Sequence, residues 1–305
     1  MTLILCHCIL NTNARAPGIA LWGGVVKPVY DILKENKISF MQLPCPEASY
    51  IGLRRWWFVK EQYDNALYRD YCREMLIGFS EILLENDVRR FEVIGLGISP
   101  SCGYRETQSD ETWGGRPRSV DVTRNVKQGS GVWIEILEEV FKSYGFTFNI
   151  YDLPPPLIYP GKRFIGTSSY PKTYEESLKE LCERLGYNYE KLLAMSHHPI
   201  GVDADMRSRK ILLAPLEFAL KFDETLDKYV EDGFGLILIP RSNVMTHERR
   251  ALLDAIVRQV ENHVEAGHQV FIHEDDGSRL FRELLKLLGE RDLLKSIARI
   301  QGELT

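Results

Sequence analysis

The chain has 305 residues, a formal net charge of −5, 44% hydrophobic residues and 27% charged residues. This composition is typical of a soluble globular protein and excludes the disordered and fibrous classes, while the length predicts two domains. The acidic balance disfavours a protein that binds nucleic acid over its whole surface. The first ten residues lack a basic leader, and no run of about 18 apolar residues occurs. We therefore expect no signal peptide, no membrane span and a cytoplasmic location.

The first half alternates short apolar runs with amphipathic segments. Its predicted elements are strands at 3–5, 38–41, 91–98 and 146–151 and helices at 25–37, 61–86 and 132–143. Strands that alternate with helices predict a parallel sheet with right-handed crossovers. We therefore predict an α/β fold, with a Rossmann-like domain over residues 1–151.

A proline triplet at 154–156 interrupts this pattern and marks a predicted domain boundary. Residues 152–209 are predicted to be a proline-rich linker and helical connector, with a helix or a broken helical pair at 173–195. The alternation then resumes, with strands at 210–215, 235–239 and 268–273 and helices at 216–231, 247–266 and 278–288. Residues 210–305 are therefore predicted to form a second, smaller α/β domain, flavodoxin-like or Rossmann-like, whose role no motif reveals.

Cys8, Cys45 and Cys102 each follow an apolar run of the first half. The carboxyl ends of parallel strands meet at one edge of a sheet, so the three thiols are expected to converge there. Soft thiolates favour iron–sulfur clusters or zinc, and the wide spacing excludes a compact zinc knuckle or a ferredoxin motif. The alternative is three independent buried cysteines. Cys72 and Cys182, inside predicted helices, are expected to be core residues.

The remaining candidates have two interpretations each. Cys6 is either a core residue or a spare ligand. The small residues at 129–131 open a helix whose free amides suit an anion or a carbonyl oxygen, or else Ser130 is an ordinary cap. Residues 54–58 (RRWWF) either stack a heterocyclic base or pack between domains. The stretch 104–127 is either a lid or a surface hairpin. Two other clusters either bind a cation weakly or are solvated: His197, His198, Asp203 and Asp205, and His273, Glu274, Asp275 and Asp276.

Four segments carry a family resemblance: residues 8–18 (CILNTNARAPG), 45–47 (CPE), 99–103 (SPSCG) and the helix start at 131–132. In order and spacing they resemble the 2-thiouracil desulfidase family of small iron–sulfur enzymes. The resemblance covers about the first 150 residues, and the conjunction of CPE with SPSCG is far more specific than either motif alone. The chain departs from the common pattern at Asn11 and Pro17.

The resemblance implies a [4Fe-4S] cluster held by Cys8, Cys45 and Cys102, with one iron left without a protein ligand. It also implies that a thiocarbonyl compound, such as a thiouracil-like base, is converted from C=S to C=O. Glu47 and Ser101 are the implied acid/base residues of this reaction. Such a desulfidase would be a non-redox enzyme, because no net electron transfer is required.

The expected substrate-binding residues are Asn11, Asn13, Arg15 and Ser130. The expected partner is a small thiolated heterocycle. A thiolated tRNA is a weaker expectation, because residues 152–305 do not resemble the helical companion domain of family members that act on tRNA. The alternative function is a non-catalytic zinc or iron–sulfur protein, or a sulfide or cluster carrier, whose second domain docks a partner.

Overall fold

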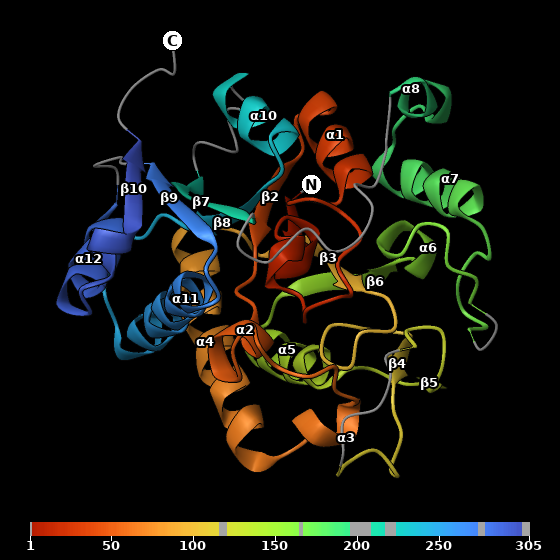
Figure 1. The fold of residues 1–305 in the computed structure, drawn as a ribbon, viewed down its shortest axis with the longest axis horizontal. Coiled ribbons are helices and arrows are strands. Elements are labelled where there is room, and N and C mark those ends of the chain that lie inside the picture. The colour runs from red at the N-terminus through yellow and green to blue at the C-terminus, as the bar shows by residue number, and fades with distance from the viewer. Residues whose placement is uncertain are drawn as a thin grey trace.

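The computed structural model describes residues 2–115, 121–164, 167–195, 209–216, 224–273 and 278–300. Two four-stranded parallel sheets flanked by helices form the framework (Figure 1). The first sheet has the order β2-β1-β3-β6, built from β1 (Thr2–Leu5), β2 (Ser39–Gln42), β3 (Arg90–Leu96) and β6 (Thr147–Leu153). The predicted α/β class with parallel sheets is confirmed.

The helices of the first half follow the predicted pattern with one difference. They are α1 (Lys27–Glu35), α2 (Pro46–Tyr50), α3 (Lys60–Tyr63), α4 (Ala66–Glu85) and α5 (Val132–Ser143). The single helix expected at 61–86 is wrong, because Asp64 and Asn65 leave the helical conformation. The Asn65 side chain then accepts a hydrogen bond from Tyr68 N at 3.0 Å, which caps the start of α4.

The described residues of the predicted connector contain the end of β6 (Thr147–Leu153) and three helices. Strand β6 continues to Leu153, and the proline triplet opens the short helix α6 (Pro155–Ile158), because the first turn of a helix tolerates proline. Helices α7 (Tyr174–Leu185) and α8 (Tyr189–Ala194) follow, and the left-handed Gly186 caps the end of α7. The expected helical pair is therefore present.

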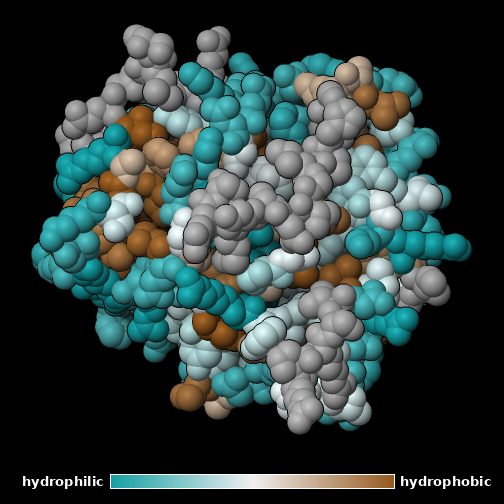
Figure 2. All heavy atoms as spheres, viewed as in Figure 1, coloured by the Kyte–Doolittle hydropathy of each residue, from teal (hydrophilic) through white to brown (hydrophobic). Residues whose placement is uncertain are grey.

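The second sheet has the order β10-β9-β7-β8. Its strands are β7 (Lys210–Pro215), β8 (Phe234–Ile239), β9 (Gln269–His273) and β10 (Ile297–Ile300), and its described helices are α10 (Glu224–Glu231), α11 (His247–Glu265) and α12 (Arg279–Glu290). The pattern missed β10, a short edge strand with two exposed central residues. On the face drawn in Figure 2, hydrophobic side chains gather on the left, over this second sheet.

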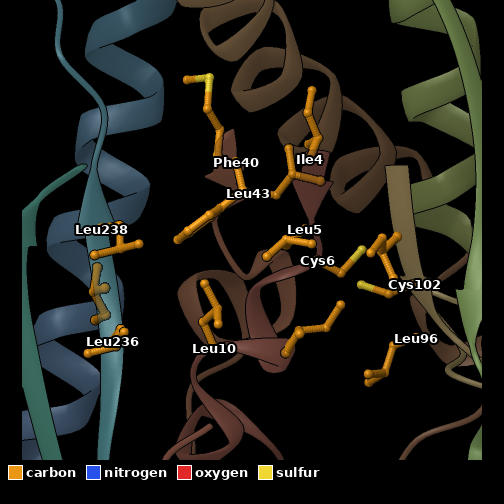
Figure 3. Packing of buried hydrophobic residues seen from close by; sticks show 14 of the residues in the cluster. Ile4, Leu5, Cys6, Leu10, Phe40, Leu43, Leu96, Cys102, Leu236 and Leu238 are labelled. Atoms are coloured by element: carbon orange, nitrogen blue, oxygen red, sulfur yellow. The ribbon is translucent and has the colours of Figure 1, made fainter. Parts of the chain in front are cut away.

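The two halves share one hydrophobic core that includes Leu10 and Leu43 of the first half and Leu236 and Leu238 of β8 (Figure 3). One buried amide also joins the two sheets. Gln42, at the end of β2, accepts from Leu238 N and donates to Leu236 O, both at 2.9 Å. The boundaries predicted from sequence therefore separate two sheets that pack as neighbours.

Helices α4 and α11 approach each other closely at Gly78. A Cβ at this position would lie 2.4 Å from the backbone oxygen of Glu248. The close approach therefore requires glycine, which has no Cβ, at position 78.

Gly78→Ala should destabilise the protein by about 1–3 kcal/mol, because backbone atoms have to move apart. Gly289→Ala is the matched control, because this helical glycine meets only the flexible Leu294 side chain, at 3.4 Å. Midpoints of urea unfolding measure both changes. Equal midpoints for the two variants would contradict this account of the α4–α11 contact.

Candidate metal and active site

A pocket that is partly open to solvent lies at the carboxyl edge of the first sheet. Cys8, Cys45 and Cys102 all line it, although they follow three different strands. Cys8 lies in the short 3-10 turn His7–Ile9, Cys45 directly precedes α2, and Cys102 follows β3. The structure therefore brings the three predicted thiols together, because the strands before them are parallel neighbours.

The cysteines of this edge associate in two pairs. A hydrogen bond between the Cys45 and Cys8 thiols, together with burial, raises the pKa of Cys45 well above its usual range. A hydrogen bond with Cys6, together with burial, does the same for the pKa of Cys102. Figure 3 shows the sulfur atoms of Cys6 and Cys102 pointing toward one another. Cys6 is buried behind Cys102 and does not line the pocket.

The loop that carries Cys102 is held by a dense set of backbone hydrogen bonds. Leu96 N donates to Cys102 O at 2.8 Å, and Cys102 N donates to the Ser99 hydroxyl at 3.0 Å. Ile98, a buried β-branched residue, adopts a left-handed conformation with φ of 62°. This conformation is costly for such a side chain, so the loop is fixed by its surroundings rather than by local preference.

The first turn of α5 completes this loop. Val132 N donates to Pro100 O and Ile134 N to Ser101 O, both at 3.2 Å. A Cβ on Gly131 would lie 2.4 Å from Ser101 O, so only glycine allows this approach. These amides therefore hold the cysteine loop, whereas the sequence suggested a free anion site or a cap.

Glu47 lines the pocket from the first turn of α2. Its Oε2 atom accepts from Arg55 Nε at 3.0 Å and from the Tyr63 hydroxyl at 2.9 Å. Arg55 is buried and also donates to Gly52 O and Ala14 O, both at 3.0 Å. The carboxylate is thus fixed through one oxygen, and Oε1 takes part in none of these contacts.

Arg15 also lines the pocket, together with Tyr159 of the connector. Its guanidinium donates to the Tyr159 hydroxyl and stacks over the ring, with its central carbon 4.5 Å from the ring centre. Arg15 is only 5% exposed, and no carboxylate pairs with it among the residues that the structure describes.

Trp56, Trp57 and Phe58 also line the pocket. Trp56 is 65% exposed, whereas Trp57 is buried and donates to Gln108 Oε1 at 2.9 Å. Trp57 also meets the Trp113 ring edge to face, with 5.2 Å between ring centres. The described part of the stretch 104–127 contains β4 (Glu106–Gln108) antiparallel to β5 (Val126–Gln128), and its Trp113 packs on Trp57.

Four predicted site residues lie outside the pocket. The Ser101 hydroxyl is fully buried, 3.2 Å from the Tyr68 hydroxyl, and Ser130 donates to Tyr104 O at 2.8 Å. Asn13 donates to Lys210 O at 3.2 Å, and Asn11 contacts the His7 ring. Each of these side chains joins segments of the scaffold, and none of them lines the pocket.

Sequence reasoning missed several lining residues: His7, Tyr63, Gln108 and Tyr159. Tyr159 was not recognised as a lining residue, because it belongs to the predicted linker. Arg55 was noticed as a stacking cation, but its ion pair with Glu47 was not. Nothing in the sequence pattern pointed to that pair, because Arg55 lies beyond the end of α2.

The donor set fits an iron–sulfur cluster. Three thiols from separate loops face one pocket, and each cysteine of a cluster binds a different iron. Within the described ranges, no three His, Cys, Asp or Glu side chains lie close enough to hold a single metal ion. The other predicted cation clusters lie largely outside the described residues, at 196–208 and 274–277.

A 101-residue segment is 37% identical to the uncharacterized protein MJ0003 of Methanocaldococcus jannaschii. The segment covers 32% of this chain, and the chain spans 65% of the length of that relative. No protein-family model and no solved structure matches the chain. No helix among the described residues is long and apolar enough to cross a membrane. The desulfidase resemblance therefore remains a prediction that depends on the motifs.

Two buried histidines near the pocket give a pH prediction. Burial lowers the pKa of His7 and of His268 to about 4. The unfolded chain binds these protons below about pH 6.5, whereas the folded chain does not until about pH 4, so stability should fall as the pH falls through this window. Each histidine contributes up to about 3 kcal/mol at 1.36 kcal/mol per pKa unit.

Urea unfolding between pH 7 and pH 5 measures this loss. His268→Gln should show a shallower loss of stability than the wild type. The exposed His247 provides the control, since His247→Gln should leave the slope unchanged. A wild-type slope of zero would contradict the interpretation that these histidines are neutral when folded.

Proposed function

We propose that this protein is an iron–sulfur enzyme that removes sulfur from a small thiocarbonyl compound, such as a thiouracil-like base. The observation that carries the proposal is the convergence of Cys8, Cys45 and Cys102 on one pocket that also contains Glu47 and Arg15. Three soft ligands suit a [4Fe-4S] cluster, and a carboxylate beside them suits proton transfer. A purely structural metal site would need neither charged group.

Cys8, Cys45 and Cys102 would hold the cluster through their thiolates. Held by these three residues, a [4Fe-4S] cluster would supply a Lewis acid that suits a soft thione sulfur. The cluster ligands come from loops with fixed backbones, and Ala48 N already donates to Cys45 Sγ at 3.3 Å. Hydrogen bonds of this kind orient a ligand sulfur and tune the metal site.

Glu47 would act as the base toward water. Arg55 and Tyr63 hold Oε2, which leaves Oε1 to accept a proton from a water molecule in the pocket. The water oxygen bonds to the thiocarbonyl carbon and the carbon–sulfur bond breaks. The balance is C=S plus H₂O giving C=O plus H₂S, with no change in oxidation state.

Arg15, Tyr159 and Trp56 would bind the substrate. The Arg15 guanidinium suits an oxygen or nitrogen edge of a heterocycle, and the exposed Trp56 ring suits its flat face. The Ser101 hydroxyl has no part in this proposal, because it is buried against Tyr68. Ser101 would act only through its backbone oxygen, which helps to hold α5.

Cys8→Ser, Cys45→Ser and Cys102→Ser should each abolish cluster binding, because each removes a soft ligand. Cys72→Ser is the control and should bind the cluster normally, since Cys72 is buried within α4. Iron and acid-labile sulfide, measured after anaerobic reconstitution, should give about four irons per chain in the wild type. Stoichiometric zinc, or full iron in the three variants, would overturn the proposal and favour a non-catalytic metal protein.

Glu47→Gln should retain the cluster and lose about 100-fold or more in turnover, because the base is removed while the side-chain shape is kept. Loss of thiouracil absorption measures turnover, and iron content measures the cluster. Glu175→Gln, on the exposed face of α7, should behave as the wild type. Unchanged turnover in Glu47→Gln would exclude the proposed role of Glu47 and leave the cluster assignment standing.

A further inference from the structure

Gln259, on α11 of the second half, contacts both loops that carry the paired thiols Cys8 and Cys45. Its Oε1 atom accepts from the backbone N–H of Cys45 at 3.3 Å, and its Nε2 atom lies 2.5 Å from His7 Nε2. The side chain is fully buried, so water does not compete for these bonds. The Gln259 amide thus contacts the backbone of Cys45 and the side chain of His7, which directly precedes Cys8.

The hydrogen-bond partners define the orientation of this amide. His7 Nδ1 lies 3.1 Å from Leu43 O, and because a carbonyl only accepts, Nδ1 carries the hydrogen of the neutral ring. His7 Nε2 is therefore an acceptor and takes hydrogen bonds from Gln259 and from Asn11 Nδ2, the latter at 3.1 Å. Only with its NH₂ group toward His7 does Gln259 also accept from Cys45 N.

A second contact lies one turn further along α11. Asn262 Nδ2 donates to Ala48 O at 2.9 Å, in the middle of α2. A Cβ on Gly52, just after α2, would lie 2.9 Å from Asn262 Oδ1, so the chain passes closely there too. Helix α11 therefore holds the Cys45 end of α2 and the segment that follows it.

Apolar packing supports the same contact. Ala266, just after α11, belongs to a small cluster separate from the main core, together with Ala14, Cys45, Ala48 and Leu53. Cys8 packs against this cluster. The second half thus supplies both hydrogen bonds and apolar contact at the back of two thiols.

These contacts point to a role for the second half. We propose that Gln259 is a positioning residue, and that α11 of the second half completes the cysteine pocket by fixing the loops of Cys8 and Cys45. The second α/β unit is then part of the active-site scaffold rather than a separate ligand-binding module. The relevance of this positioning to turnover rests on the proposed function, whereas the positioning itself does not.

The polar chain beyond Gln259 does not form a proton path to the pocket. Asn11 Nδ2 also lies 3.4 Å from His263 Nε2, and His263 Nδ1 lies 2.7 Å from His268 Nδ1. The hydrogen on His7 Nδ1, however, is held by the Leu43 carbonyl instead of facing a reacting group. These hydrogen-bonded side chains therefore orient His7 and, through it, the turn that carries Cys8.

The test uses the full-length protein without a cluster. Gln259→Leu removes both hydrogen bonds at similar side-chain size, and alkylation of each cysteine by iodoacetamide is followed by mass spectrometry. We expect the rates at Cys8 and Cys45 to rise about 10-fold relative to Cys102, which α11 does not contact through Gln259. Cys102 is an internal reference, because a general loss of stability would raise all three rates together.

A control variant distinguishes the loss of these hydrogen bonds from the effect of replacing any glutamine by leucine. Gln269→Leu makes the same change at an exposed position of the second half and should leave all rates unchanged.

A wild-type alkylation pattern in Gln259→Leu, or a parallel rise at all three cysteines, would overturn the proposal. Iron content after reconstitution is measured separately, and Gln259→Leu should bind less iron than Gln269→Leu. Selective alkylation in a protein that binds no iron would uphold the positioning role and refute the proposed function. The two inferences can therefore fail independently.

Discussion

The register of the first sheet is the constraint on which the site depends. Leu5, the last residue of β1, pairs with Gln42 of β2 and with Ile94 of β3. All three strands run parallel, so their chains leave the sheet at the same edge within a few residues of one another. Cys8 and Cys45 each lie three residues beyond the paired position, and Cys102 follows after a tight loop. Three thiols separated widely in sequence thereby reach one pocket.

Where the chain leaves the sheet, its backbone N–H and C=O groups no longer pair with a neighbouring strand. Groups from distant segments form hydrogen bonds with them instead. The amides of α5 bond to the loop of Cys102, and the carboxylate of Asp152 accepts from Tyr104 N and Arg105 N just after it. Gln259 Oε1 likewise accepts a hydrogen bond from Cys45 N. Buried backbone groups rarely stay unpaired, so these partners fix the loops as firmly as the strands do. Segments from both halves of the chain thus hold the backbone around the pocket.

Local pattern sufficed to predict most strands of the two four-stranded sheets, most of the longer helices and the convergence of the cysteines. Each of these features depends on apolar periodicity or on the ends of parallel strands. The contacts of Gln259, Tyr159 and Asn13 were beyond such reasoning, because their partners lie more than 100 residues away and polar residues inside a helix or a linker carry no signal of burial. The place of Ser101 in a conspicuous motif suggested a chemical role, and the burial of its hydroxyl against Tyr68 gave no signal in the sequence.

The pocket contains charged side chains close to its cysteines. Arg55 is balanced by Glu47, whereas Arg15 is buried without a carboxylate partner among the described residues. As thiols, Cys45 and Cys102 are neutral, because their hydrogen bonds to other cysteines and their burial raise their pKa values. Under the proposed function, cluster binding converts them to thiolates and releases protons. The buried Arg15 guanidinium, which lines the same pocket, would then have negative charge nearby.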